Sequence, residues 1–108
     1  MTENLKKELV QRIVRNLSDV QILRLVESQP MWGYMIKKQV EARFGLKLRH
    51  GALYPLLKAI KKKGFVTSET QRQGGRTRLV YTITGKGKEY LEAYKEILKG
   101  QIEGADIR

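Results

Sequence analysis

The spacing of the apolar residues changes once along this chain, and that change constrains the fold most. Ahead of Gly64, apolar side chains recur at intervals of three and four residues, which is the spacing of one helical face. Between Phe65 and Ile83, β-branched and aromatic residues flank the pair Gly74-Gly75, as in a β-hairpin. Helical spacing then returns. The expected order is four helices, a hairpin and one last helix.

Capping and breaking residues set the expected helix boundaries. Asn16 or Ser18 is predicted to cap the second helix, because either side chain can accept a hydrogen bond from its first N–H groups. Pro30 disfavours helical backbone at the preceding residue, and Gly45 suits a left-handed helix end. We predict the first four helices over residues 5–17, from residue 18 to before Pro30, over Met31–Phe44 and over Gly51–Lys63.

The hairpin and the last helix follow from the second half of the pattern. We predict strands over Phe65–Arg72 and Arg78–Ile83, with the hairpin tip at residues 73–77. Thr84 is predicted to cap the last helix, and residues 100–108 are predicted to fray. The fold class is therefore mainly α with a small β-hairpin.

Basic residues are concentrated in the middle of the chain. The whole sequence has 22 basic and 11 acidic residues, a net charge of +11. Residues 37–88 alone hold 14 basic and two acidic residues, a net +12, so the two ends together carry −1. Solvated helix faces usually pair their basic residues with acids, which this segment lacks. The charge predicts a polyanionic partner, with nucleic acid ahead of an acidic membrane surface.

The inventory of side chains excludes several kinds of site. With no cysteine and one histidine, the sequence cannot supply a thiolate or multi-histidine site, and we predict no metal and no cofactor. No Gly-rich phosphate loop follows a strand and the acids are dispersed, so we do not expect an enzyme. The chain has no long apolar run and no signal-peptide pattern, so a cytoplasmic protein outside the membrane is expected.

Six short segments carry a family resemblance. They are Trp32-Gly33-Tyr34 with Ile36, Phe44-Gly45, Gly51-Ala52-Leu53-Tyr54-Pro55-Leu56-Leu57, Lys63-Gly64-Phe65-Val66, Gly74-Gly75-Arg76, and Tyr81-Thr82-Ile83-Thr84 with Gly87. In this order they resemble motifs of the PadR family of winged-helix transcriptional regulators, over about residues 17–98. The layout is that of a winged helix-turn-helix with additional N- and C-terminal helices. We expect a DNA-binding domain at 18–84 between dimerisation segments at 1–17 and 85–108.

The expected DNA contacts come from three elements. The fourth helix would be the recognition helix, with its apolar side on the body and its basic side in the major groove. Its predicted contacts, including its leading end, are Arg49, His50, Tyr54, Lys58, Lys61 and Lys62. Those of the wing are Arg72, Arg76 and Arg78, and those of the third helix to the DNA backbone are Tyr34, Lys37 and Lys38. Packing roles remain open for Tyr34 and Tyr54.

The two end helices are predicted to form a homodimer. One small domain cannot fully bury both of their apolar stripes, so the stripes should pack on each other and on a second subunit. The predicted interface is Leu5, Leu9, Ile13, Tyr90, Leu91, Tyr94, Ile97 and Leu98. The family resemblance implies the same dimer and a small-molecule effector near it, which the sequence does not identify. Trp32, Tyr90 and Tyr94 could line its pocket or belong to the core.

The leading hypothesis is a sequence-specific transcriptional regulator that acts as a repressor. It would bind palindromic operator DNA as a homodimer through the helix at 51–63 and the wing at 65–83. The alternative is a non-specific architectural or RNA-binding winged-helix protein, which the charge supports equally well. A membrane-surface protein fits less well, because the basic segment lacks a large apolar face beside its charges.

Overall fold

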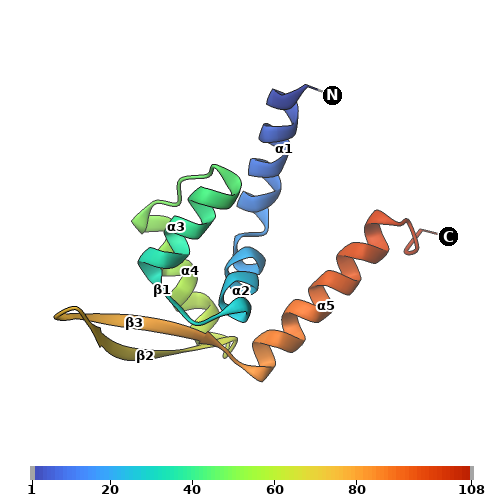
Figure 1. The fold of residues 1–108 in the computed structure, drawn as a ribbon. Coiled ribbons are helices and arrows are strands. Elements are labelled where there is room, and N and C mark those ends of the chain that lie inside the picture. The colour runs from blue at the N-terminus through green and yellow to red at the C-terminus, as the bar shows by residue number, and fades with distance from the viewer. Residues whose placement is uncertain (1, 108) are drawn as a thin grey trace.

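The chain folds into five helices and a three-stranded antiparallel sheet over residues 2–107, the part that the computed structural model describes (Figure 1). The helices are α1 Glu3–Asn16, α2 Ser18–Ser28, α3 Gly33–Phe44, α4 His50–Lys62 and α5 Gly85–Ile102. The strands are β1 Met31–Trp32, β2 Val66–Gln73 and β3 Arg76–Ile83, in the sheet order β1-β3-β2. The side chains of His50 and Gln73 lie outside the described part. The predicted fold class is confirmed.

A short strand replaces the predicted first residues of the third helix. Met31 pairs with Tyr81 and Trp32 pairs with Val80, both on β3, so α3 begins at Gly33. The prediction of helix at residues 31–32 is wrong, because the local spacing of apolar residues carries no information about a strand partner far along the chain. The pairing ties the start of α3 to the sheet.

The cap of α2 also differs from the prediction. The N-cap residue is Leu17, and no side chain caps the helix. Ser18 Oγ donates instead to the carbonyl oxygens of Val14 and Arg15, at 3.1 and 2.8 Å, and Asn16 is the last residue of α1. The two helices follow each other so closely that Ser18 bonds back to the turn before it.

Three other predicted boundaries are confirmed. The second helix stops before Pro30, and Gly45 ends α3 with a φ of +65°. Thr84 caps α5, because its Oγ1 accepts from the Gly87 N–H at 3.0 Å. A Cβ on Gly87 would lie 2.1 Å from the Phe65 carbonyl oxygen, so only glycine allows this close approach between α5 and the start of the wing.

The hairpin turns on two residues. Gly74 and Gly75 both have positive φ, +56° and +78°, as a type I′ turn requires. The strands therefore run to Gln73 and Arg76, and the wider tip predicted at 73–77 is wrong. Because glycine adopts positive φ without steric strain, the pairing between β2 and β3 continues up to the two turn residues.

The core lies where α2, α3, α4 and the sheet meet the first half of α5. Its largest fully buried side chains include Ile22, Leu23, Ile36, Leu53, Leu57 and Leu91. The rings of Phe65 and Tyr90 stack with their centroids 4.3 Å apart, and the Tyr90 hydroxyl donates to Asp19 Oδ2 at 3.2 Å. These contacts fix the beginning of α5 to α2.

The remaining parts of α1 and α5 extend beyond the core as two arms. In Figure 1, α1 (blue) and α5 (orange to red) leave the body separately, and their free ends lie well apart. The radius of gyration is 15.5 Å, whereas a compact chain of this length has about 13 Å. Because α1 and α5 lie apart in Figure 1, the prediction that the two end helices pack on each other does not hold within one chain. Helix α5 also continues to Ile102, beyond the predicted onset of fraying.

Candidate nucleic-acid interface

Helix α4 presents two chemically different sides. Leu53, Leu57 and Ile60 are buried against the body, whereas Lys58, Lys61 and Lys62 are exposed. The helix lies one residue ahead of its predicted bounds, and the predicted division into an apolar and a basic side matches this burial. An amphipathic helix of this kind can be held by one side while the other enters a groove of DNA.

The basic residues of the central segment have no acidic partners. The ion pairs among residues 2–107 are Lys6 with Glu3 and Lys95 with Glu27 and Glu92, and all of them lie outside 37–88. The positive charge of this segment is therefore not neutralised within the described part of the chain. Such a surface attracts phosphate groups from a distance.

The leading end of α4 is open to an anion. Arg49 is its exposed N-cap residue, and no side chain caps the helix or places an acid in its first turn. Its first N–H groups and the positive end of its dipole consequently favour a negative ligand. The backbone of His50 opens the helix, while the predicted base contact by its side chain falls outside the described side chains.

Tyr54 combines packing with exposure. Its side chain is 40% exposed, yet a Cβ on Gly33 would lie only 2.8 Å from its Oη. The ring therefore rests on the first residue of α3, which has to be small there. Burial, and then the nearby Tyr54 hydroxyl, raise the pKa of Tyr81 above its usual value. Both roles considered for Tyr54 are thus compatible with its position.

The first turns of α3 add a second group of predicted contacts. Tyr34 is 50% exposed and does not belong to the core. Lys38 Nζ lies 5.4 Å from the centroid of the Tyr34 ring, within the range of a cation–π contact. Lys37 is partly buried and lines a groove beside α4.

The three wing arginines are not equivalent. Arg72 pairs with Thr77, so it shares a face of the hairpin with the buried Tyr81. Arg76 and Arg78 lie on the other face. Arg72 and Arg76 are exposed near the glycine turn, whereas Arg78, two residues beyond Arg76 along β3, is partly buried. The sequence analysis grouped the three arginines by their charge, whereas the strand register places Arg72 on one face and Arg76 and Arg78 on the other.

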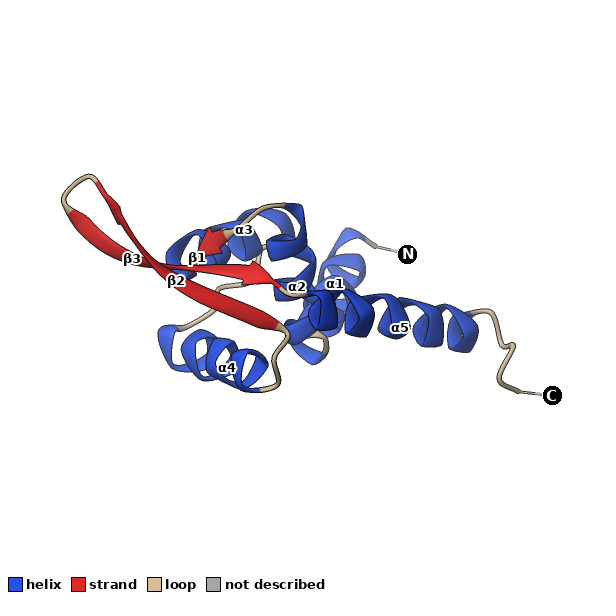
Figure 2. Ribbon diagram, turned by 90° about the horizontal axis from the view of Figure 1, so that it is seen from below, coloured by secondary structure: helices blue, strands red, loops and turns tan. Residues whose placement is uncertain are grey.

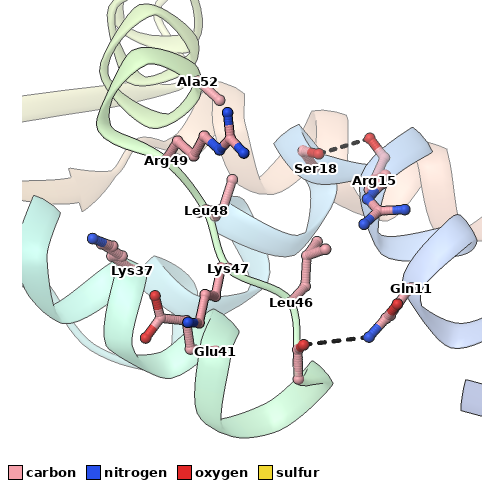
Figure 3. A pocket seen from close by; sticks show the side chains of 11 residues that line it. Gln11, Arg15, Ser18, Lys37, Glu41, Leu46, Lys47, Leu48, Arg49 and Ala52 are labelled. Carbon is pink, nitrogen blue, oxygen red and sulfur yellow. Dashed lines mark hydrogen bonds between the residues drawn. The ribbon is translucent and has the colours of Figure 1, made fainter.

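A basic groove runs between α1, the α3–α4 loop and the start of α4 (Figure 3). Its volume is about 700 Å³. Its basic lining residues are Arg15, Lys37, Lys47 and Arg49, and Glu41 is the acid among them. In Figure 3, the side chains of Arg15 and Arg49 extend into the space between α1 and α4. The groove continues the positive surface from α4 toward α1.

Arg15 and Lys47 were not among the predicted contacts. Lys47 stands between buried Leu46 and half-buried Leu48, and this alternation in an extended segment is the signal that points its side chain outward. For Arg15 the sequence shows only that it lies off the apolar stripe of α1. Its position beside the loop depends on how α1 packs, which a single-helix pattern does not contain.

The predicted dimer residues fall into two groups. Leu5, Leu9 and Ile13 are 45–54% exposed, and Ile97 is 64% exposed. Leu91 is fully buried inside one chain, so it holds α5 on the core and offers no surface to a partner. The apolar residues Val10 and Ile102 are also exposed on the arms and were missed by the prediction.

The aromatic residues considered for an effector pocket lie in different places. Tyr94 lines a shallow cavity of about 180 Å³ on α5 with Ile97 and Leu98. Trp32 lines a separate cavity of about 190 Å³ between the start of α3 and strand β3. Within residues 2–107, no helix is long and apolar enough to span a membrane, and no cluster of three acidic or histidine side chains could hold a metal.

The chain is similar to known proteins in sequence and in fold. The profile of the transcriptional regulator PadR-like family matches residues 22–93. A structure from Thermoplasma acidophilum assigned as a transcriptional regulator is 35% identical, with a TM-score of 0.72, over 88% of this chain and 90% of that one. A PadR family transcription regulator from Clostridium difficile is 28% identical, with a TM-score of 0.75, over 83% and 95%.

One similar structure contains DNA. Bacillus subtilis PadR in complex with operator DNA is 30% identical, with a TM-score of 0.67. The match covers 72% of this chain and 45% of that protein, so this chain spans less than half of its length. Comparison with curated protein sequences gives no match.

Proposed function

The chain belongs to the PadR-like family of transcriptional regulators, and we propose that it is a repressor that binds palindromic operator DNA as a homodimer. The observation that carries the proposal is the unpaired positive charge of α4, the wing and the groove. Bacillus subtilis PadR, a similar protein, has been solved with operator DNA, which supports the same partner for this chain.

The recognition helix is α4. Lys58, Lys61 and Lys62 would meet phosphates or base edges, while Arg49, Tyr54 and the His50 side chain at its leading end would read bases. The exposed wing arginines Arg72 and Arg76 would track the backbone or enter a narrow minor groove. Tyr34, Lys37 and Lys38 would contact the backbone where α3 crosses it.

Dimerisation is assigned to the arms. An exposed apolar stripe on each arm is unfavourable in water, and burying it against a second copy would remove that cost. The stripe residues are Leu5, Leu9, Val10 and Ile13 on α1, and Tyr94, Ile97, Leu98 and Ile102 on α5. A two-fold axis through the arms would present two α4 helices to two half-sites of one operator.

The test is selection of genomic DNA fragments by the purified full-length protein. A shared palindrome with half-sites about one helical turn apart, or a multiple of it, would support the proposal. Recovery of fragments without a common motif would contradict it and favour the non-specific architectural protein. Selection of transcribed RNA in parallel separates the RNA-binding alternative, because that protein would enrich RNA over duplex DNA.

A further inference from the structure

We propose that Trp32 is a positioning residue. Its indole ring orients Arg78 toward the DNA backbone and links strand β3 of the wing to the start of α3. The inference rests on the proposed function, since it assigns roles within the same DNA-binding surface. Trp32 itself would make no contact with DNA. Its contribution would be to set where the Arg78 guanidinium points.

Trp32 stands where three elements meet. It is the last residue of β1, pairs with Val80 of β3, and is the N-cap residue of α3. Arg78 is two residues before Val80, so its side chain lies on the same face of the sheet and diagonally opposite Trp32. The Arg78 Cζ is 4.6 Å from the centroid of the indole ring. This is well inside the range of a cation–π contact.

The ring orients Arg78 without neutralising it. Glu69, the acid of the wing, pairs with Val80 and so lies on the same face, but no ion pair within the described residues joins it to Arg78. The Nε atoms of Arg78 and Trp32 are buried, and neither has a hydrogen-bond partner among residues 2–107. The full positive charge of Arg78 therefore stays available to a phosphate, held in one plane by the indole.

A guanidinium fixed in one plane suits a phosphate better than a mobile one. Its two parallel N–H groups can bind two phosphate oxygens at once, and less side-chain freedom is lost when the contact forms. Arg72 and Arg76 are exposed beside the glycine turn, and neither contacts an aromatic ring among the described side chains. Loss of Trp32 should therefore weaken the contribution of Arg78 and leave that of Arg76 unchanged.

The test is a double-mutant cycle in DNA affinity with Trp32→Leu, Arg78→Gln and the double variant of the full chain. A lost charge-assisted contact would make Arg78→Gln bind about tenfold more weakly. Trp32→Leu should weaken binding about fivefold when Arg78 is present, and less than about twofold when it is absent. Trp32→Phe should restore most of the affinity, because it keeps an aromatic face.

The matched control for the cycle is Arg76→Gln, which removes a cation from the same face without a ring partner. Trp32→Leu should cost the same factor with and without Arg76. Equal losses in all three backgrounds would overturn the proposal, because Trp32 would then act only through the general fold. If Trp32→Leu unfolds, the fluorescence comparison of Arg78→Gln with Arg76→Gln keeps the proposal testable, because Trp32 stays in place in both variants.

Fluorescence tests the pairing without DNA. Trp32 is the only tryptophan in the sequence, so its emission reports directly on the guanidinium that covers it. Arg78→Gln should change the emission spectrum and increase acrylamide quenching, whereas Arg76→Gln should change neither. An unchanged spectrum and unchanged quenching in Arg78→Gln would overturn the proposal. This result does not depend on operator binding, so it is distinguishable from failure of the proposed function.

Discussion

The wing end and the arm end of this molecule expose opposite chemistry. Figure 2 shows the wing extending in one direction and the free end of α5 in the other. The central segment that contains α4 and the wing has a net charge of +12 and no ion pair among the described residues, while the ends carry −1 and hold the ion pairs. Most of the exposed large aliphatic side chains lie on the arms.

The two ends thus separate two forces, and each force suits one of the two proposed partners. Charge acts at a distance and is weakened by salt, which suits DNA. Burial of apolar surface acts only at direct contact and does not depend on DNA, which suits association with a second copy of the chain. Variants in each region should therefore change different measurable quantities.

The largest expected effect comes from breaking the arms. Leu9→Asp combined with Ile13→Asp should give a folded monomer. The two side chains are exposed within one chain, but the charges placed there could not be buried against a partner. Operator affinity should fall about a hundredfold or more, since the two half-sites would no longer be bound together. Sedimentation and DNA titration measure both effects. Asn4→Asp, outside the stripe, is the control, and a persistent dimer would contradict the assignment of the arms.

Neutralising the wing should have the next largest effect. Arg72→Gln with Arg76→Gln should weaken binding to every duplex about tenfold or more. The negative slope of log K against log salt should become shallower by about 1.8, about 0.9 for each lost phosphate contact. The control is Lys99→Gln on α5, at the other end of the molecule. An unchanged salt slope in the wing variant would exclude the wing from DNA binding.

A smaller effect should separate the two roles of Tyr54. Tyr54→Phe keeps the ring on Gly33 and removes only the hydroxyl. If that hydroxyl contributes to base recognition, operator affinity should fall about fivefold while affinity for random duplex stays the same. Comparative titrations at one salt concentration measure this. Equal affinities for wild type and variant on both duplexes would leave Tyr54 a packing residue.

The smallest effect concerns the attachment of α5. Burial and the contact with Asp19 raise the pKa of Tyr90 above its ordinary value. Because the folded state holds this proton more tightly, the stabilisation is complete below the unfolded pKa of about 10 and is lost as pH rises through the folded value. Tyr90→Phe should lose about 1 kcal/mol of unfolding free energy at neutral pH.

The same variant should show a shallower fall in stability in alkali. Urea unfolding at several pH values around the unfolded tyrosine pKa measures the fall in both proteins. Tyr81, whose pKa is also raised, keeps part of the pH dependence in the variant. Identical curves for wild type and Tyr90→Phe would show that the link to Asp19 does not hold α5 in place.

The sequence predicted those elements whose signals are local. Helical spacing gave α4 within one residue, and Thr84 was correctly expected to cap α5. The sequence analysis missed β1, because these two residues form a strand only by pairing with β3. It placed Leu91 in the dimer interface, because a helical stripe does not show where one protomer's core ends and a partner begins.

The candidate site was predictable as a set of charges and less so as a geometry. Lys58, Lys61 and Lys62 lie on the exposed side that their spacing indicated. The strand register separates Arg72 from Arg76 and Arg78, and the contact with Trp32 distinguishes Arg78 from Arg76. Both depend on contacts between distant parts of the chain, which composition and spacing do not determine.

The central claim is that the basic end recognises one DNA sequence, and one competition titration tests it most directly. Labelled duplex carrying the selected palindrome is bound by the full-length protein and displaced with unlabelled palindrome or with random duplex at the same salt concentration. We expect random duplex to compete about a thousandfold or more less strongly than the palindrome. Displacement by both duplexes at similar concentrations would contradict it.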